Sequence, residues 1–201
     1  MAEISPQEIG RFERVKLLQL VKEDNVYQWQ AVQGVWAEFK ADGGKNLFSA
    51  NGIGARNATF ILRRFNGITL FNAFKYNGKH YFLTLIENLD RMYRKVTAAE
   101  IEPTICSYTP KVYSKDEYNR PTEIEGEEII FPACITEKFV GYTQTAVTAK
   151  TEVTFVFVTP KEIVLFVGDE IVADGKTYQI EKVHLLDEYK NEYEATVKGD
   201  V

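Results

Sequence analysis

The feature that most constrains this chain is an internal repeat. Thr59-Phe60-Ile61 and the residues up to Phe71 align with Thr154-Phe155-Val156 and the residues up to Phe166, at an offset of 95. After a two-residue insertion, Asn77-Gly78-Lys79-His80-Tyr81 aligns with Asp174-Gly175-Lys176-Thr177-Tyr178 at an offset of 97. A repeat this long is a whole domain and not one unit of a solenoid. We therefore expect two related domains, residues 1–102 and 103–201, with the boundary near Glu102-Pro103.

Each copy has the pattern of a β domain. Asn77-Gly78 and Asp174-Gly175 are preferred type I′ hairpin dipeptides, because both central positions need positive φ. They are flanked by residues that alternate with a period of two, as in half-buried strands. The stretch Thr154–Val158 is β-branched and aromatic, which favours a buried strand.

Further strands complete the expected architecture. Turn clusters at 23–25 and 116–121 separate strand-like segments, the first between 15–21 and 26–32, the second between 111–113 and 122–124. This spacing predicts a mainly β protein of two tandem small barrels or sandwiches. One short N-terminal helix is expected to begin at Ser5-Pro6-Gln7-Glu8, which carries capping signals.

Composition and charge narrow the function classes. The chain of 201 residues has a net charge of −5 and a pI near 5.3, unlike typical basic nucleic-acid-binding domains. Residues 1–102 carry 14 Lys and Arg against 11 Asp and Glu, whereas residues 103–201 carry 10 against 18. The sequence has no apolar run long enough to span a membrane and no signal-peptide pattern, so we expect cytoplasmic synthesis.

The sequence contains no recognisable catalytic constellation, and we expect a protein that is not an enzyme and has no cofactor or metal. His80 and His184 do not correspond in the repeat, and nothing marks either as part of a triad. Cys106 and Cys134 form no Cys-x-x-Cys pair, so free buried thiols are expected instead of a zinc site. The glycines near 43–54 match neither a dinucleotide fingerprint nor a P-loop.

One segment in each copy fits no core pattern. Residues 42–57 are rich in Gly and Asn, residues 139–150 are small, polar and rich in Thr, and both lie between corresponding predicted strands. A long loop at a fixed place in a duplicated scaffold favours a contact or switching element. The candidate contact residues are Gly43, Gly44, Lys45, Asn51, Gly52, Gly54 and Arg56 in the first copy, and Gly141, Tyr142, Thr143 and Gln144 in the second.

Two binding functions remain as alternatives. Charged and aromatic residues interleave at Arg63-Arg64-Phe65 and Lys75-Tyr76, as in barrels that stack single-stranded nucleic acid, although the second copy lacks these arginines. The Tyr and Trp content also suits a carbohydrate-binding β module. Exposed aromatic side chains on one flat face would favour that module, and burial of Trp29 and Trp36 would oppose it.

The order of several short motifs resembles the head–tail joining proteins of tailed bacteriophages, also called head-closure, stopper or head-completion proteins. The motifs in this chain are Val35-Trp36-Ala37-Glu38, a long loop, Thr59–Arg64, Phe74–Tyr81 and Asn88-Leu89-Asp90-Arg91. The resemblance covers residues 10–102. The second copy is similar in a diverged form, because it keeps Asp174–Tyr178 and Leu186-Asp187 but lacks the Trp and the arginines. Two such domains in tandem depart from the family's usual single domain.

The resemblance implies a structural role in the virion neck. Such proteins form a homo-oligomeric ring between the portal or adaptor and the tail-tube or tail-terminator protein, retain the packaged double-stranded DNA and open for ejection. By position, residues 42–57 and 139–150 would be the channel loops. As a hypothesis, six chains would present twelve similar domains, matching a twelve-fold portal to a six-fold tail. A tail-terminator or baseplate protein is the structural alternative.

Overall fold

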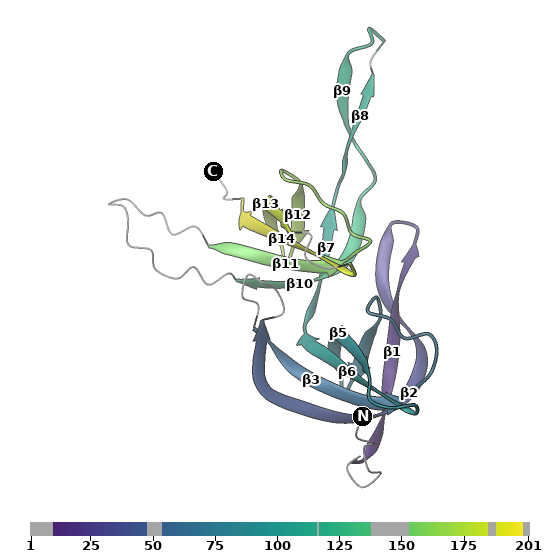
Figure 1. Cartoon of the computed structure of the whole chain (residues 1–201). Helices are drawn as coiled ribbons and strands as arrows, with labels where there is room; N and C mark the ends of the chain where they lie inside the picture. The colour runs from purple at the N-terminus through teal and green to yellow at the C-terminus, as the bar shows by residue number, and fades with distance from the viewer. Residues whose placement is uncertain (1–9, 48–53, 116, 138–152, 185–187, 199–201) are drawn as a thin grey trace, which may run out of the picture. The chain divides into compact units, whose positions relative to one another are not determined.

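The computed structural model describes residues 10–47, 54–115, 117–137, 153–184 and 188–198, and within these only the backbone of 42–47, 54, 55, 113, 121 and 123. The described residues form β-strands joined by turns and contain no helix (Figure 1). The predicted β class is therefore confirmed. The expected N-terminal helix at Ser5–Glu8 lies outside the described residues, and Phe12 begins a strand. No helix in the described part of the chain is long and apolar enough to cross a membrane.

The chain divides into two compact units. Unit 1 comprises Met1–Val21 and Trp29–Pro103, and unit 2 comprises Lys22–Gln28 and Thr104–Val201. Unit 2 therefore includes seven residues from the first sequence copy, which form the turn of the first hairpin.

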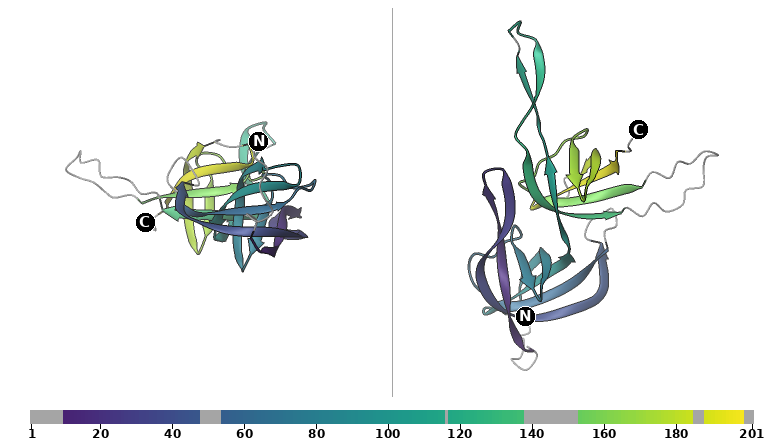
Figure 2. Two further views of the ribbon diagram at one scale, coloured as in Figure 1. Left: turned by 60° about the horizontal axis from the view of Figure 1, so that its bottom comes forward. Right: turned by 180° about the vertical axis from the view of Figure 1, so that it is seen from behind.

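Unit 1 is built on a closed ring of six strands (Figure 2). In ring order these strands are β1 (Phe12–Glu23), β4 (Ala73–Tyr76), β5 (Lys79–Asn88), β6 (Tyr93–Ile101), β3 (Gly54–Arg63) and β2 (Val26–Leu47). A pairing between β1 and β2 closes the ring, as in a small barrel. The core of the barrel is aromatic: the Phe60 ring centroid lies 4.9 Å from that of Phe74 and 5.2 Å from that of Tyr81.

Unit 2 repeats this strand order. Its ring is β7 (Pro103–Tyr108), β12 (Glu170–Ala173), β13 (Lys176–His184), β14 (Lys190–Val197), β11 (Thr154–Pro160) and β10 (Ile129–Glu137), closed by a pairing of β10 with β7. The core has Phe157 and Tyr178 at its centre, with ring centroids 5.0 Å apart. A further hairpin, β8 (Lys111–Lys115) and β9 (Pro121–Glu125), lies between β7 and β10 and projects from this barrel (Figure 1).

The hairpin turns confirm the sequence prediction. Asn77 and Gly78 have φ of 48° and 80°, and Asp174 and Gly175 have φ of 50° and 72°. Both pairs join adjacent antiparallel strands in the same register, β4 with β5 and β12 with β13. Two positive φ values in sequence are what a type I′ turn requires.

A shared irregularity supports descent of the two barrels from one module. The ladder between β5 and β6 shifts register between Leu83 and Leu85, and the ladder between β13 and β14 shifts between Ile180 and Lys182. These positions are 97 residues apart. Bulges are retained within protein families as designed features, so a bulge at corresponding places argues against chance similarity.

The ladders correct one part of the sequence alignment. Phe60 faces Val96, whereas Phe157 faces Tyr193, and Val96 and Tyr193 are themselves 97 residues apart. The structural counterpart of Phe60 is therefore Phe157 and not Phe155. The sequence pattern could not distinguish the two alignments, because a slip of two residues leaves every side chain of a strand on the same face.

Candidate contact site on the first barrel

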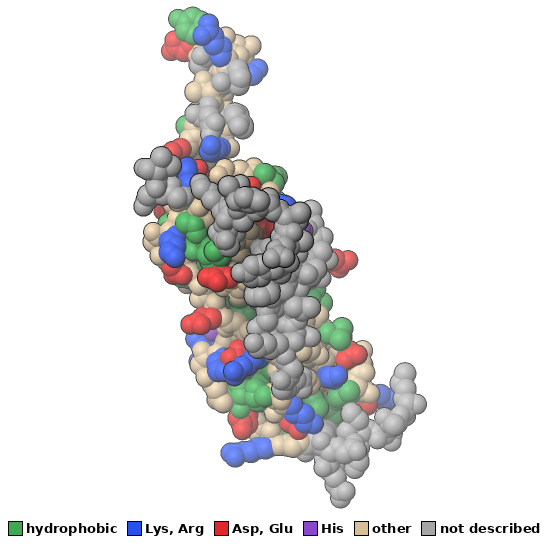
Figure 3. Space-filling view, turned by 90° about the vertical axis from the view of Figure 1, so that its left-hand side faces the viewer, with side chains coloured by type: hydrophobic (Ala, Val, Ile, Leu, Met, Phe, Trp, Pro, Cys, Tyr) green, Lys and Arg blue, Asp and Glu red, His purple; other side chains and the backbone are tan. Residues whose placement is uncertain are grey.

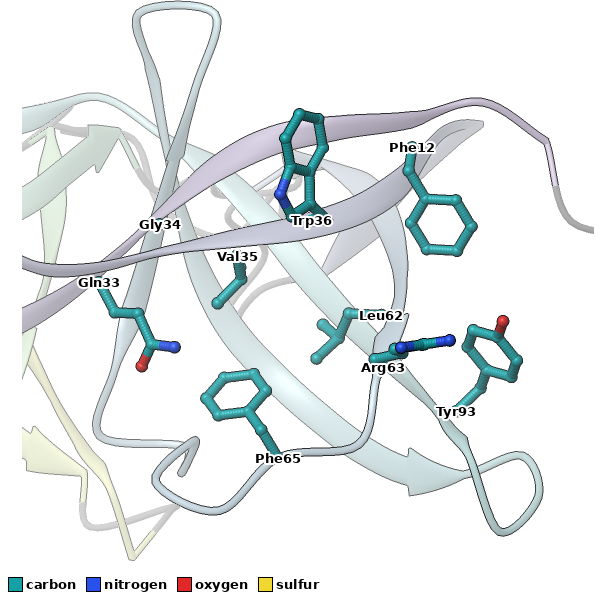
Figure 4. A pocket seen from close by; sticks show the side chains of 9 residues that line it. All are labelled: Phe12, Gln33, Gly34, Val35, Trp36, Leu62, Arg63, Phe65 and Tyr93. Atoms are coloured by element: carbon teal, nitrogen blue, oxygen red, sulfur yellow. The ribbon is translucent and has the colours of Figure 1, made fainter.

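An aromatic cavity of about 520 Å³ opens along the edge of β2 in unit 1 (Figure 4). Its lining comes from the start of β1, the middle of β2, the end of β3 with the following loop, and the start of β6. The lining residues are Phe12, Gln33, Gly34, Val35, Trp36, Leu62, Arg63, Phe65 and Tyr93.

Strand alternation places Trp36 outside the barrel. Val35 and Ala37 are buried, so the intervening side chain points to the opposite face, and Trp36 is 63% exposed. Exposure of so large an apolar side chain at a cavity is typical of a contact surface.

The cavity exists because β2 continues past its neighbour. The ladder between β2 and β3 begins with Ala37 opposite Leu62, and after Arg63 the chain leaves β3. The N–H of Arg64 donates to the carbonyl oxygen of Met92 at 2.6 Å, and the Arg94 guanidinium donates to the carbonyl oxygen of Phe65 at 3.0 Å. These bonds hold the loop that carries Phe65 at the rim.

The surroundings of the cavity are basic. A neighbouring hollow is lined by Arg14, Lys16 and residues 31–34, and the Arg14 side chain lies so close to Gly34 that a Cβ there would approach its Nε to 2.7 Å. Another hollow is lined by Arg63, Arg64 and Arg91, together with Phe65, Asn66 and Met92. Acidic or neutral groups on a partner would be favoured here over basic ones.

The segment 42–57 is not the open loop expected from its composition. β2 runs to Leu47 and β3 begins at Gly54, with Lys45 opposite Arg56 and Leu47 opposite Gly54. The register shifts between Ala41 and Lys45, so Gly43 and Gly44 lie within a bulge. The backbone ladder needs no apolar side chains, which is why residue composition concealed these strands.

The other candidate contact residues belong to segments outside the described part of the chain. Asn51 and Gly52 lie outside the described residues, as do Gly141, Tyr142, Thr143 and Gln144. The structure therefore brings together Gly43, Gly44, Lys45, Gly54 and Arg56 in one hairpin and leaves their role as a prediction.

Neither histidine occupies a recognised catalytic arrangement among the described residues. Burial, followed by the charge of Lys75, lowers the pKa of His80, and His80 Nδ1 is buried without a hydrogen-bond partner. His184 Nε2 lies 2.9 Å from the carboxylate of Glu194. Within the described ranges, no three His, Cys, Asp or Glu side chains form a group that could hold a metal ion.

The two cysteines are buried free thiols, as predicted. Burial raises the pKa of Cys106 to about 12. A thiol with so high a pKa is a poor nucleophile and a poor metal ligand at neutral pH, so Cys106 is a packing residue.

The exposure of the aromatic side chains bears on the two alternative binding functions, stacking of nucleic-acid bases and carbohydrate binding. Tyr76 is buried in the unit 1 core and its hydroxyl donates to the carboxylate of Glu13, so its ring is not available for base stacking. Trp29 is half-buried, with its ring centroid 5.7 Å from that of Phe82. Trp36 alone of the two tryptophans has the exposure that a carbohydrate-binding face requires.

Sequence reasoning missed the aromatic cavity as a site. The signal was present, because Trp36 stands between the apolar residues Val35 and Ala37, where alternation turns it outward if both neighbours are buried. The wall formed by Phe12, Phe65 and Tyr93 depends on three separate elements and has no local signal.

Comparisons with known proteins give limited similarity. No family model matches the chain, and no curated protein matches it. A solved structure described as the virion of a native gene transfer agent particle is similar over 46% of this chain and 97% of its own chain, with 20% sequence identity and a TM-score of 0.37.

Proposed function

We propose that this chain is a structural virion protein of the phage neck. In this role it joins the portal or adaptor of the DNA-filled head to the tail and helps to retain and release the genome. It acts through contacts with other proteins and not through catalysis.

The observation that carries the proposal is the placement of the sequence motifs in the fold. Trp36-Ala37-Glu38 lies in β2, Arg63 ends β3, the Tyr76–Tyr81 stretch forms the β4–β5 hairpin, and Asp90-Arg91 lies in the turn before β6. Asp90 orders that turn, because its carboxylate accepts from the N–H groups of Met92 at 2.6 Å and Tyr93 at 2.7 Å. The motifs that resemble the joining proteins thus occupy defined strands and turns.

The repeated barrel supports assembly into a ring. Rings arise from head-to-tail interfaces that close by rotation. Six chains would present twelve barrels of one strand order, which suits a junction between twelve-fold and six-fold neighbours. By their place in the chain, the β2–β3 hairpin and residues 139–150 would face the channel.

Deletion of the gene tests this proposal. Particles from the deletion strain should be DNA-filled heads without tails, which electron microscopy distinguishes from normal virions. Complementation with the full chain should restore tailed particles. Normal particles from the deletion strain would contradict the neck role, and intact tails with malformed ends would indicate a tail-terminator or baseplate role instead.

Carbohydrate binding is a second candidate, favoured by the exposed Trp36 and the polar groups of Gln33 and Arg63 beside it. An indole stacked on a sugar changes its fluorescence. Titration with a panel of oligosaccharides, with Trp36→Ala as the control, would reveal such binding as a saturable signal that the variant lacks. The neck proposal predicts no saturable change.

A further inference from the structure

The turn of the β1–β2 hairpin is packed into unit 2. The N–H of Ile130 in β10 donates to the carbonyl oxygen of Asn25 at 2.9 Å, and Val26 pairs with Ile130 in parallel. The Asn25 side-chain amide donates to the carboxylate of Glu127 at 2.6 Å, and Tyr27 packs against the unit 2 core. A hairpin turn thus adds backbone pairing and one aromatic ring to a barrel edge.

This contact uses the part of β10 that extends past β11. The first residue pair of the ladder between β10 and β11 is Cys134 with Val158, so Ile130 precedes the ladder and has no partner in β11. A strand that continues past its neighbour leaves backbone groups that another strand can pair with, which is β-augmentation.

The same edge exists in unit 1 at the aromatic cavity. Val158 in β11 is the counterpart of Ile61 in β3. Cys134 pairs with Val158 and Glu38 pairs with Ile61, so Cys134 is the counterpart of Glu38. Four residues earlier on the same two strands, Ile130 is therefore the counterpart of Gly34. Like Ile130, Gly34 lies beyond the ladder to the next strand, and it lines the cavity. The cavity is therefore the unit 1 counterpart of the position that the first hairpin fills in unit 2.

Unit 2 has a hairpin corresponding to the one that fills this position. The β8–β9 turn lies between β7 and β10 as the first turn lies between β1 and β2. Asn119 has a φ of 64°, as Asp24 has a φ of 52° in the first turn. Each hairpin also carries a tyrosine with a cation near its ring, Lys22 at 5.4 Å from Tyr27 and Arg120 at 5.6 Å from Tyr118.

The tip of the second hairpin has the character of a contact surface. Tyr118 is 77% exposed, and Val112 and Ile124 on the strands behind it are half-exposed. Hydrophobic, basic and acidic side chains lie together on the surface at this tip (Figure 3). Exposed tyrosines are frequent anchors of protein interfaces.

We propose that the β8–β9 hairpin of one chain docks into the aromatic cavity of a second copy of this chain. Tyr118 enters the cavity beside Trp36, and the hairpin turn pairs with the β2 edge at Gly34, repeating the arrangement within unit 2. Glu117, next to Tyr118, is opposite in charge to Arg14 and Arg63 near the cavity, whereas Arg120 beside the Tyr118 ring has the same sign, so the aromatic contact and the strand edge carry the docking. The docking hairpin belongs to unit 2 and the cavity to unit 1, so the contact between two chains is head-to-tail. Only the closure of such contacts into a ring rests on the proposed function.

Complementary variants test the contact. Tyr118→Ala removes the anchor of the hairpin, and Trp36→Ala removes a wall of the cavity. Each variant alone should associate at least tenfold more weakly than the unaltered chain in sedimentation velocity, about the effect of losing an aromatic anchor. Phe166→Ala, which truncates a side chain that is 67% exposed elsewhere on unit 2, should associate normally.

A mixture of charge variants tests the direction of the contact. Tyr118→Asp disables the β8–β9 hairpin and leaves the cavity intact, whereas Trp36→Asp disables the cavity and leaves the hairpin intact. Each alone should remain monomeric, and an equimolar mixture should form a heterodimer that grows no further. A mixture that stays monomeric, or one that forms larger assemblies, would overturn the head-to-tail arrangement. Circular dichroism verifies that every variant is folded.

Disulfide trapping covers the case of weak association. Asn119→Cys and Gln33→Cys, in separate chains, should give a cross-linked dimer on oxidation. Lys79→Cys, at the exposed β4–β5 turn away from the cavity lining, replaces Gln33→Cys as the control. Cross-linking no greater than the control would overturn the inference even if the gene deletion gave tailless heads. Efficient cross-linking together with normal virions would instead sustain the contact and refute the neck role.

Discussion

Replacement of Phe157 by Ala tests the barrel correspondence most sharply. Phe157 is fully buried at the centre of the unit 2 core, 5.0 Å from the Tyr178 ring. Burial of a Phe side chain contributes about 1.5–3 kcal/mol. The cavity left by truncation adds to this, so Phe157→Ala should lower the free energy of unfolding by about 3–5 kcal/mol.

Phe155→Ala is the matched comparison. Phe155 is two residues away on the same strand and only partly buried, with its ring centroid 5.2 Å from that of Tyr178. Its truncation should cost less, roughly 1–2 kcal/mol, because less apolar surface is removed from the core. Phe60→Ala in unit 1 should match Phe157→Ala, because Phe60 is the fully buried counterpart.

The measurement is urea unfolding followed by circular dichroism at one fixed protein concentration, since self-association stabilises the folded state by mass action. Phe166→Ala, at an exposed aromatic position, should change stability by less than about 0.5 kcal/mol. A cost for Phe155→Ala equal to or above that for Phe157→Ala would refute the offset of 97 in this strand and restore the offset of 95.

Three further predictions concern individual buried groups. Tyr193→Phe should lower the free energy of unfolding in urea by about 1–3 kcal/mol, because the Tyr193 hydroxyl donates to the Ile163 carbonyl and accepts from the Leu165 N–H. Tyr178→Phe is the control, and an equal loss in both variants would count against this reasoning. Cys106 should resist alkylation at pH 8 in the native chain and react after denaturation, because burial raises its thiol pKa to about 12; mass spectrometry showing rapid native labelling would contradict this. Since burial lowers the pKa of His80, the unfolded chain binds more protons near pH 6.5, so stability should fall as pH drops below that value. His80→Gln should reduce this pH dependence, and an unchanged slope would exclude His80 as its source.

Local chemistry predicted the turns and the face of each strand. Asn77-Gly78 and Asp174-Gly175 specify type I′ turns through their positive φ, so the hairpins could be assigned from four residues. The register of the strand at Phe155 and Phe157 could not be assigned from sequence, because a slip of two residues preserves the side-chain pattern. The similar apolar residues at Phe155 and Phe157 made the shorter offset equally plausible in sequence.

The candidate site depended on longer-range structure. The Gly-rich segment 42–57 lacked apolar alternation, yet backbone pairing of Lys45 with Arg56 extends both strands into it. The aromatic cavity collects residues that are far apart in sequence around the outward-facing Trp36. The pairing of Val26 with Ile130 is also invisible to periodicity, because it joins residues from different copies.

Imaging of assembled particles tests the central claim most directly. Cryo-electron microscopy of virions carrying a tagged chain should show a ring of six copies, and thus twelve six-stranded barrels, between the portal and the tail. Absence of the tag from purified particles, or its location away from this junction, would contradict the account.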